Sequence, residues 1–303
     1  MKEHRVCILG GTGFVGHHLT GALARAGYTC RILTRRPERH RDLRLYPRVE
    51  LRQADVFERA ALAEGLAGCE TMVNLVGILN EGRAASFRRV HVELVERLVE
   101  AGAEAGIGRY LHMSALHADA KAGSSVYLRT KGEGEDLAHA QGALTTTSFR
   151  PSVIFGRGDS FFNRFAGLLR LSPRVMPLAC PGARFAPVSA VDVAAMMVWA
   201  LQHPVSAGRR YDLCGPRVFT LKELVEYTAR TIGRPTLVLG LGDFVSRLQG
   251  RVMQVLPGAP FTLDNYLSLQ TDSVCTHSAL ADAGITPTDV DAVVPTYLRR
   301  FGR

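Results

Sequence analysis

The sequence predicts an α/β protein with a doubly wound parallel sheet and a small mixed lobe in its C-terminal part. Two observations predict this class. Short runs of β-branched residues alternate with helix-length segments through the first half of the chain, and a glycine-rich turn directly follows the first run. Strands separated by helices are joined by crossover connections, so the strands lie parallel and helices cover both faces of the sheet.

The predicted elements alternate regularly as far as Arg150 and then become mixed. The expected strands are Arg5–Leu9, Thr29–Leu33, Val49–Gln53, Thr71–Asn74, Tyr110–Met113, Thr145–Phe149 and Arg210–Leu213. The expected helices are Phe14–Gly27, Phe87–Ala105, Val126–Ala140, Phe161–Leu171, Ala190–Leu201 and Leu221–Ile232. Five prolines after residue 234 indicate short helices in the C-terminal part.

The composition is that of an ordinary globular protein, with 47% hydrophobic and 21% charged residues among 303. No apolar run approaches the roughly 18 residues of a membrane-spanning helix. The first apolar run, Val6–Leu9, is shorter than the roughly 7–15 residues at the centre of a secretory signal. We therefore expect a cytoplasmic protein.

The net charge of +9 favours anionic partners, such as nucleotide phosphates or an acidic lipid surface. Residues 31–52 are the densest arginine stretch, but they contain neither interleaved stacking aromatics nor a zinc pattern, so no nucleic-acid partner is expected. The histidines lack metal-ligand spacing, and no metal site is expected. The six cysteines form no C-x-x-C pair, and we expect them to be reduced packing residues: Cys7, Cys30, Cys69, Cys180, Cys214 and Cys275.

Glycines spaced G-x-x-G-x-x-G occupy the junction between the first expected strand and the first expected helix. Glycine permits a tight turn and lets the backbone approach a pyrophosphate, while the helix N-terminus offers free N–H groups. The motif therefore predicts a dinucleotide site in a Rossmann-type fold. Its expected cofactor contacts are Gly10, Thr12, Gly13, Phe14, Val15 and Gly16.

The second expected strand ends near Thr34, where an NAD-selective site commonly has an acid that binds the ribose hydroxyls. Here Arg35 and Arg36 follow instead. Guanidinium groups supply charge-assisted donors to a 2′-phosphate, so NADP(H) is favoured over NAD(H), with Arg35 the first candidate. The alternative is that both are solvated surface arginines.

Two further strand ends carry expected cofactor contacts. Asp55 and Val56 follow the third strand, where a carboxylate can accept hydrogen bonds from an adenine amino group, or cap the helix that begins near Glu58. After the fourth strand, the backbone is exposed at the carboxyl edge, where open α/β sheets bind ligands. The expected contacts there are Leu75, Val76 and Gly77.

Tyr127 and Lys131 are four residues apart and lie on one face of an expected helix. An unperturbed phenol has a pKa near ~10, and a neighbouring ammonium favours the phenolate, so Lys131 is expected to lower the Tyr127 pKa and also to hold the nicotinamide ribose. Ser114 ends the preceding strand and is expected to hydrogen-bond a substrate carbonyl while Tyr127 transfers the proton. These three residues are the expected catalytic set.

Together these motifs resemble the extended and atypical members of the short-chain dehydrogenase/reductase superfamily over nearly the whole chain. The segments that carry this resemblance are Gly10–Gly16, Asp55–Val56, Asn74–Gly77, Ser114, Tyr127 with Lys131, Arg150–Gly156, Pro187–Ala194 and Tyr211–Gly215. Within the superfamily, the sequence is similar to a group related to the nucleotide-binding accessory subunit of respiratory complex I. That similarity rests on Met113–Leu116, Tyr127–Glu135 and Leu256–Asn265.

The resemblance implies an NAD(P)-binding Rossmann domain over residues 1–155, rejoined by residues 188–215, and a substrate or lid lobe of residues 156–187 and 216–303. Pro151 and Val153 are then further cofactor contacts. The implied activity is that of an oxidoreductase acting on an unidentified small molecule at a carbonyl or alcohol centre.

The alternative function is a non-catalytic protein that holds NADP(H) as an accessory or redox sensor. It would serve quinone-linked respiratory complexes or coenzyme Q synthesis, peripheral at the inner membrane face. One residue bears on this choice. Where many active members have an asparagine that relays protons, this chain has His91, which either relays protons as well or packs beneath the cofactor.

Residues Leu237–Leu256 show apolar residues at helical spacing, with Arg247 and Arg251 among them. An amphipathic helix is therefore expected there. It would pack as a lid on its own lobe, rest on an acidic membrane surface, or dock on a partner protein.

Overall fold

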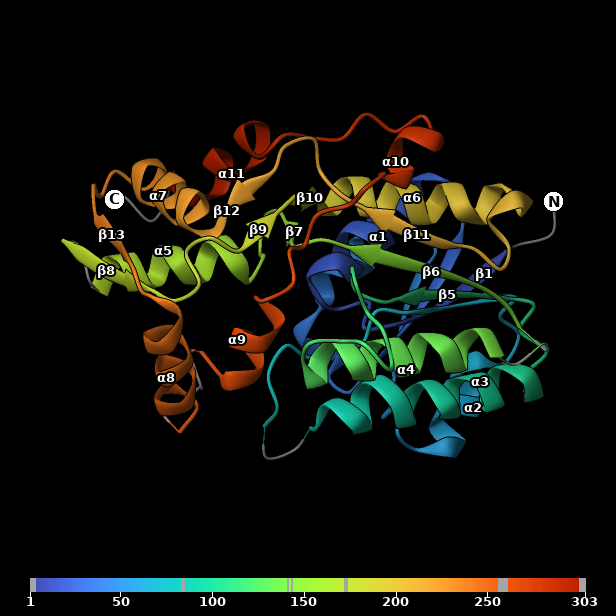
Figure 1. The fold of residues 1–303 in the computed structure, drawn as a ribbon. Coiled ribbons are helices and arrows are strands. Elements are labelled where there is room, and N and C mark those ends of the chain that lie inside the picture. Colours follow the sequence, from blue (N-terminus) through green and yellow to red (C-terminus); the bar gives the residue numbers. More distant parts are fainter. Residues whose placement is uncertain are drawn as a thin grey trace.

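The centre of the molecule is a seven-stranded sheet in which every strand runs parallel to its neighbours, in the order β11-β6-β5-β4-β1-β2-β3 (Figure 1). The computed structural model describes residues 4–82, 85–140, 142, 144–171, 174–255 and 261–299. The sheet strands are β1 (Arg5–Leu9), β2 (Thr29–Thr34), β3 (Val49–Gln53), β4 (Thr71–Asn74), β5 (Arg109–Met113), β6 (Thr145–Pro151) and β11 (Arg210–Leu213). The strand order reverses at β1 and β4, so the predicted doubly wound fold is confirmed.

Helices cover both faces of the sheet (Figure 1). One face carries α1 (Phe14–Arg25) and α6 (Ala190–Gln202). The other face carries α2 (Arg59–Leu66), α3 (Leu94–Glu104) and α4 (Val126–Ala140). Each face has its own buried apolar cluster, with Leu19 and Met197 in the first and Leu62, Leu98 and Ala138 in the second. Burial of these side chains holds the helices against the sheet.

The expected helix Phe87–Ala105 is helical but not uniform. Residues Arg89–Glu93 form a π-helical turn, η3, that leads directly into α3. A π turn accommodates one extra residue within a helix and often occurs at functional sites. His91 lies at the centre of η3, a feature that apolar periodicity does not reveal.

The C-terminal lobe is built from short strand pairs and helices around a second core that includes Phe155, Phe162 and Leu224. Its helices are α5 (Phe161–Leu171), α7 (Leu221–Thr231), α8 (Asp243–Met253), α9 (Leu263–Ser268) and α11 (Val290–Leu298). Its strands are β8 (Val175–Leu178), β9 (Arg184–Phe185), β12 (Phe219–Thr220) and β13 (Leu237–Gly240). The elements that connect the two parts are β7 (Ile154–Phe155), β10 (Val188–Ser189) and α10 (Ala279–Asp282), and the short turns are η1 (Pro37–Arg39), η2 (Arg41–Leu45) and η4 (Pro204–Ser206).

The single helix expected over Leu237–Leu256 is wrong in its first part. Residues Leu237–Gly240 form β13, which pairs in parallel with β8, and only Asp243–Met253 is helical. A strand partner about sixty residues away in sequence supplies the hydrogen bonds of β13, and local helical spacing cannot report such a partner. Residues 256–260, which contributed to the resemblance, lie outside the described part.

The cysteine prediction is wrong for one pair. Cys214 and Cys275 form a disulfide, whereas the thiols of Cys7, Cys30, Cys69 and Cys180 are free. The disulfide joins the end of β11 to the segment before α10, and the sequence separation of 61 between the two cysteines hides this proximity from any spacing rule. None of the described helices combines the length and apolar character needed to cross a membrane.

Candidate functional site

The predicted cofactor and catalytic residues follow the carboxyl ends of six adjacent strands. In the order of the sheet, β6 ends at Pro151, β5 precedes Ser114, β4 precedes Leu75, β1 precedes Gly10, and β2 and β3 precede the arginine and aspartate candidates. Because all six strands are parallel, these ends meet at one edge of the sheet. The structure therefore places the candidates in a row long enough for an extended dinucleotide.

The glycine loop fits a pyrophosphate. Gly10 has a left-handed backbone (φ +77°), and a Cβ at Gly16 would lie 2.4 Å from the carbonyl oxygen of Gly10, so no larger residue fits there. Gly13 caps α1 without any side-chain hydrogen bond to the first turn. The N–H groups of that turn therefore suit an anion. Phe14 lies against the loop after β7, since a Cβ at Gly156 would be 3.3 Å from its ring.

Arg35 and Arg36 are exposed at the end of β2, as a contact to a ribose phosphate requires. Within the described part of the chain, neither guanidinium forms an ion pair, and the backbone N–H of Arg36 donates to Thr34 Oγ1 at 3.4 Å. The structure therefore keeps both cations available near the expected adenosine end.

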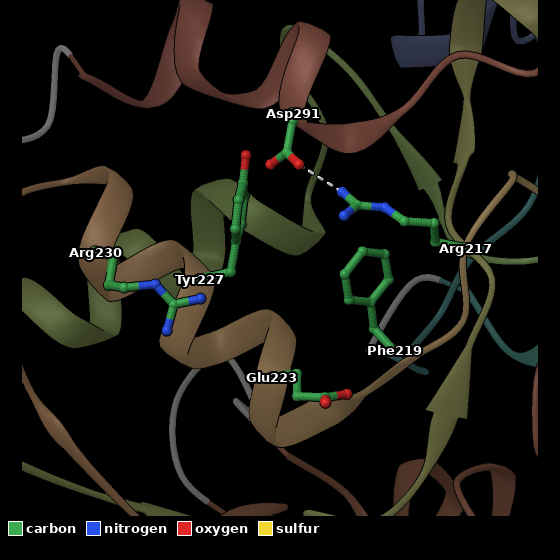
Figure 2. A pocket seen from close by; sticks show the side chains of 6 residues that line it. All are labelled: Arg217, Phe219, Glu223, Tyr227, Arg230 and Asp291. Carbon is green, nitrogen blue, oxygen red and sulfur yellow. Dashed lines mark hydrogen bonds and ion pairs between the residues drawn. The ribbon is translucent and has the colours of Figure 1, made fainter.

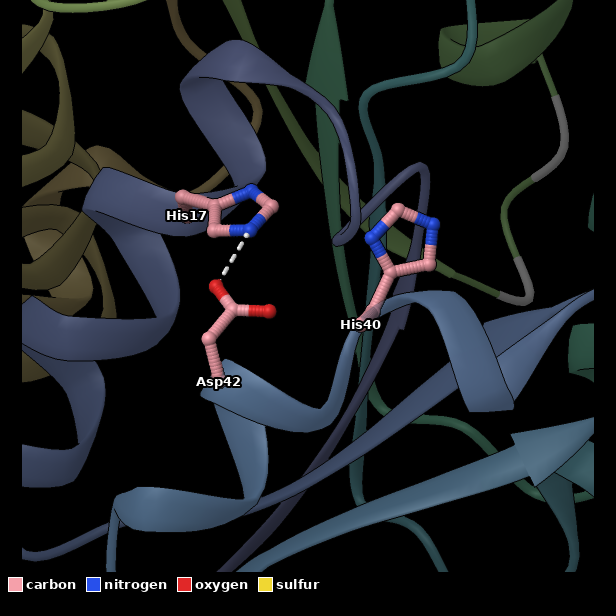
Figure 3. Close-up of side chains that lie close together, drawn as sticks. All are labelled: His17, His40 and Asp42. Carbon is pink, nitrogen blue, oxygen red and sulfur yellow. Dashed lines mark hydrogen bonds and ion pairs between the residues drawn. The ribbon is translucent and has the colours of Figure 1, made fainter.

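A histidine cluster that the sequence analysis missed lies beside this end (Figure 3). His17 Nε2 is 3.1 Å from Asp42 Oδ2, and His17 Nδ1 is 2.9 Å from the carbonyl oxygen of Gly13. The potential ligand atoms of His17, His40 and Asp42 all lie within 4.8 Å of one another. The His17 contacts tie η2 to the first turn of α1. Asp42 and His17 are 25 residues apart, so no metal-type spacing signals the cluster.

After both β3 and β4, a side-chain oxygen holds the backbone that carries the candidate residues. Asp55 Oδ1 accepts from the Phe57 N–H at 3.0 Å and does not cap α2, whose N-cap is Glu58. The segment after β4 is fixed by Asn74, whose Oδ1 accepts from the Val76 N–H at 3.0 Å. A Cβ at Gly77 would lie 3.8 Å from Lys131 Nζ, so this segment passes beside α4.

The expected catalytic residues converge where α4 meets the end of β5. Lys131 Nζ donates to the carbonyl oxygen of Met113 at 2.6 Å, which ties the lysine to the strand end next to Ser114. The Ser114 hydroxyl is buried and makes no hydrogen bond of regular geometry with a described residue, but it lies close enough to the Glu135 carboxylate to help lower the pKa of that group. A buried hydroxyl without a well-formed hydrogen bond is costly.

The electrostatics of this cluster differ from the sequence expectation. Burial, together with the negative charge of Asp264, raises the pKa of Tyr127 to about 12. Burial lowers the pKa of Lys131 to about 8, against the opposing charge of Glu135. The Tyr127 pKa is therefore raised rather than lowered as expected, because desolvation of the phenolate and the charge of Asp264 act in the same direction and Lys131 is not among the groups that shift it.

His91 uses both ring nitrogens for structural contacts. Its Nε2 accepts from the Ile78 N–H at 3.2 Å, and its Nδ1 lies 3.1 Å from the hydroxyl of Thr130, which itself donates to a backbone carbonyl of α4. Burial lowers the His91 pKa to about 3, with the charge of Lys131 acting in the same direction. The ring also packs edge-on against Tyr127. A neutral, fully bonded imidazole matches the packing alternative better than a proton relay.

Close helix packing fixes the position of α4. A Cβ at Gly134 would lie 1.9 Å from the carbonyl oxygen of His91, and one at Gly132 would lie 2.4 Å from the Ala120 nitrogen. Only glycine fits at both positions, so the backbone of α4 lies directly against the backbone of η3 and of the loop that precedes α4.

Asp264 of α9 is a site residue that the sequence analysis did not single out for a role. Its carboxylate accepts from the backbone N–H of Val126 at 2.7 Å and of Tyr127 at 3.2 Å, so the C-terminal lobe caps the catalytic helix. Ser268 reinforces this contact through Ser125, with 2.8 Å between the hydroxyls. Asp264 and Tyr127 are 137 positions apart in the sequence, so no local pattern signals the contact.

Glu135 is a second residue that sequence reasoning missed. Its carboxylate is only 1% exposed and accepts hydrogen bonds from Arg150 at 2.6–3.0 Å and from Arg210 at 2.6 Å. Burial alone would raise the Glu135 pKa, but Arg150, the Ser114 hydroxyl and Arg210 together lower it overall. The cluster joins α4, β6 and β11, and thereby fixes the helix on the sheet.

A separate cavity of about 390 Å³ lies in the C-terminal lobe (Figure 2). It is lined by Arg217, Phe219, Glu223, Tyr227, Arg230 and Asp291. Arg217 donates to Asp289 and Asp291, each at 2.6 Å, so its charge is already balanced. None of the lining residues belongs to the predicted cofactor or catalytic sets.

Comparison with known proteins places this geometry in a family. The model of the NAD dependent epimerase/dehydratase family matches residues 6–214. The chain belongs to this family. The family match covers the glycine loop, both arginine candidates and the Tyr127–Lys131 helix, which confirms the superfamily suggested by the motifs and a nicotinamide nucleotide as its class of cofactor.

Curated relatives of the chain have two kinds of names. Subunit 9 of the NADH dehydrogenase [ubiquinone] 1 alpha subcomplex from Mus musculus mitochondria is 28% identical, over 97% of this chain and 79% of that protein. The "Ceramide reductase" of Caulobacter vibrioides is 30% identical, over 78% of this chain and 74% of that protein. One relative is a respiratory subunit and the other a reductase, so family membership leaves both functions open.

Solved structures confirm the fold. The NADPH-dependent quinone oxidoreductase QOR2 of Escherichia coli, solved with NADPH, superposes with a TM-score of 0.77 at 19% identity, over 97% of this chain and 99% of that one. MoeE5 in complex with UDP-glucose and NAD gives a TM-score of 0.74 at 18% identity, over 97% of both chains.

Proposed function

We propose that the protein is an NADP(H)-dependent oxidoreductase that reduces a carbonyl group of a small molecule. The observation that carries this proposal is the convergence of Tyr127, Lys131 and the buried hydroxyl of Ser114 at the carboxyl edge of β5. The glycine loop and the uncapped first turn of α1 fit a dinucleotide on the same edge.

The roles of the residues follow from their chemistry. Bound nicotinamide would supply a hydride to the carbonyl carbon. Ser114 donates a hydrogen bond to the carbonyl oxygen, and Tyr127 transfers its phenolic proton to that oxygen, so one hydride and one proton convert the carbonyl into an alcohol. Tyr127 is protonated at neutral pH, and its raised pKa keeps it so, as its role as proton donor requires. Lys131 orients the ribose and helps to return a proton to Tyr127 after the phenol has given its own to the substrate.

We propose NADP(H) rather than NAD(H) as the cofactor. The support is the pair Arg35 and Arg36, exposed at the end of β2 where an acid would select NAD. The remaining cofactor contacts in this proposal are Asp55, Val56, Leu75, Val76, Gly77, Pro151 and Val153. The substrate domain proposed for residues 156–187 and 216–303 would then close over the nicotinamide.

The test combines nucleotide identification with one matched pair of variants. Mass spectrometry of nucleotide released from the denatured protein should identify NADP(H). Tyr127→Phe should lower carbonyl reduction by about 10²–10⁴-fold while leaving NADPH binding intact. Tyr28→Phe, at the opposite end of the sheet, is the control and should retain activity. Unchanged reduction by Tyr127→Phe would refute the catalytic assignment.

A second candidate function has an observation of its own. Similarity to the mouse respiratory subunit extends over 97% of the chain, and both nitrogens of His91 are committed to structural bonds. A non-catalytic, nucleotide-holding partner of a quinone-linked respiratory complex fits both facts. NADP(H) that does not exchange, together with co-purification with such a complex, would support this candidate, whereas rapid exchange and turnover of a carbonyl would exclude it.

A further inference from the structure

Helix α8 is amphipathic in the opposite sense to an ordinary surface helix. Its inner face consists of small residues. Ser246 is buried, and its hydroxyl accepts from the Cys180 N–H at 3.1 Å, while a Cβ at Gly250 would lie 3.0 Å from the Thr262 carbonyl oxygen. The apolar side chains lie on the outer face, where Phe244 is 79% exposed. A surface helix normally turns its apolar stripe towards the core.

The outer face of α8 forms one stripe. Its exposed apolar residues within the helix are Phe244, Val245, Leu248 and Val252. At 100° per residue they span an arc of about 100°, which is the width of a membrane- or protein-binding face. Arg247 and Arg251 are exposed along one margin of this arc. The helix packs on its own lobe, as one of the sequence alternatives had it, but through its small residues, so that its apolar stripe is left exposed.

More exposed apolar side chains lie at the same end of the lobe. Of the fifteen large hydrophobic residues that are exposed in the described part, nine lie within 171–175 and 237–255. They include Leu171 at the end of α5 and Leu237 and Leu239 on β13. Because β13 pairs with β8, the two segments are neighbours, and together with α8 they form the end of the lobe farthest from the central sheet (Figure 1). We call this region the distal end.

The charge of the distal end is strongly positive. Residues 161–183 and 234–255 contain six arginines and one acid, Asp243, which already accepts a hydrogen bond from Tyr266 at 2.7 Å. A cavity of about 550 Å³ opens there, lined by Asn163, Arg164, Gly167, Leu168, Arg170, Leu171 and Arg234. Arginines beside apolar side chains combine attraction to phosphate groups with insertion of apolar surface.

We propose that the distal end docks on an anionic lipid bilayer, with α8 lying in the plane of the interface. Basic amphipathic helices bind in this way because apolar side chains enter the acyl boundary while cationic ones remain at the headgroups. With 11 residues, α8 is about 16 Å long and therefore lies on a membrane rather than across it. Lipid fits better than a protein partner because every exposed charge on α8 beyond Asp243 is positive. The inference does not depend on the proposed reductase activity.

The test is flotation of the purified full chain with vesicles. The protein should associate with phosphatidylglycerol-containing vesicles at low salt, and association should weaken with salt or with phosphatidylcholine alone. The double variant Phe244→Glu/Leu248→Glu should lower the vesicle-bound fraction by about tenfold. Leu45→Glu is the matched control, because Leu45 is equally exposed on the sheet domain and should not affect vesicle binding.

A second pair of variants tests the charge separately. Arg247→Gln/Arg251→Gln should reduce binding to anionic vesicles, whereas Arg44→Gln, at an exposed arginine of η2, should not. Equal thermal unfolding and NADPH binding show that each variant is folded. The proposal fails if wild-type protein does not bind anionic vesicles, if the α8 variants bind as well as wild type, or if α8 binds a purified protein partner and no lipid.

Discussion

The contact between Asp264 and the first turn of α4 makes a testable link between the C-terminal lobe and Tyr127, the proposed proton donor. Asp264→Ala removes an acceptor that two backbone N–H groups share, at 2.7 Å and 3.2 Å. Asp264→Asn keeps one of the two acceptor oxygens, so it removes the charge together with one of the two hydrogen bonds. The stability of the two variants therefore reports the capping contribution, and the Tyr127 titration reports the electrostatic one.

The stability effect can be worked from these contacts. Hydrogen bonds to a charged group contribute about 1.5–3 kcal/mol, and loss of a helix N-cap costs about 1 kcal/mol. Because Asp264 is half-buried, water replaces part of the loss, so Asp264→Ala should lower the free energy of unfolding by about 2 kcal/mol. That corresponds to a fall in Tm of about 4–8 °C. Asp264→Asn should cost about half as much.

The electrostatic effect has a definite sign. The charge of Asp264 acts with burial to raise the Tyr127 pKa, so Asp264→Asn should lower that pKa while the contribution of burial remains. A tyrosinate absorbance titration, with Tyr127→Phe subtracted as background, should then show the Tyr127 step at lower pH. Where reduction is measured, its high-pH limit should move in the same direction.

The control is Asp272→Ala. Asp272 is also in the C-terminal lobe and accepts from a backbone N–H, that of Arg184 at 3.0 Å, but it does not touch α4. This variant should lower the Tm without altering the Tyr127 titration. The assigned role of the Asp264 carboxylate would be refuted if Asp264→Ala had the same Tm as wild type, or if Asp264→Asn moved the Tyr127 titration step to higher pH.

Three further outcomes are expected. Arg35→Glu should weaken NADPH binding by about 10–150-fold, since a charge-assisted contact contributes about 1.5–3 kcal/mol, with little effect on NADH, and equal losses for both nucleotides in a calorimetric titration would contradict the assigned role. Glu135→Gln should cost about 2–3 kcal/mol at pH 7 after allowing for the partial exposure of both arginines. The folded-state pKa of Glu135 is lowered, so its contribution is full above the unfolded value near ~4.3 and is lost below it, and the two proteins should converge in stability in acid. Finally, Cys214→Ser should lower the unfolding free energy by roughly 4 kcal/mol, because the disulfide closes a 61-residue separation, whereas Cys180→Ser, at a free thiol, should melt close to wild type.

Local pattern was sufficient for much of the fold. The strands Arg5–Leu9 and Thr71–Asn74 and the helix Val126–Ala140 lie where periodicity predicted them. The reason is that buried parallel strands read as apolar runs and an amphipathic helix reads as a 3.6-residue period. Crossover connections make the strands parallel, so their carboxyl ends meet at one edge of the sheet, and that edge collects the candidate cofactor residues.

The parts that escaped prediction depend on contacts between distant residues. The β13–β8 pairing, the Cys214–Cys275 disulfide and the hydrogen bond from Tyr127 to Asp264 all join segments at least sixty residues apart. The pKa of Tyr127 escaped as well, because spacing places Lys131 near the phenol but reports neither the desolvation of the phenol nor the charge of Asp264 beside it. The outward apolar face of α8 is likewise invisible to periodicity, which gives a stripe but not its direction.

The backbone contact of α4 with η3 has a consequence for anyone who engineers this protein. Replacing helical glycine by alanine is a standard route to thermostability, since it removes freedom from the unfolded chain. At Gly134 the added methyl group would instead push α4 away from η3, and at Gly132 it would push α4 away from the loop at Asp119 and Ala120, displacing Tyr127 in both cases. Gains in robustness should therefore be sought on solvent-facing helices, with these two positions left untouched.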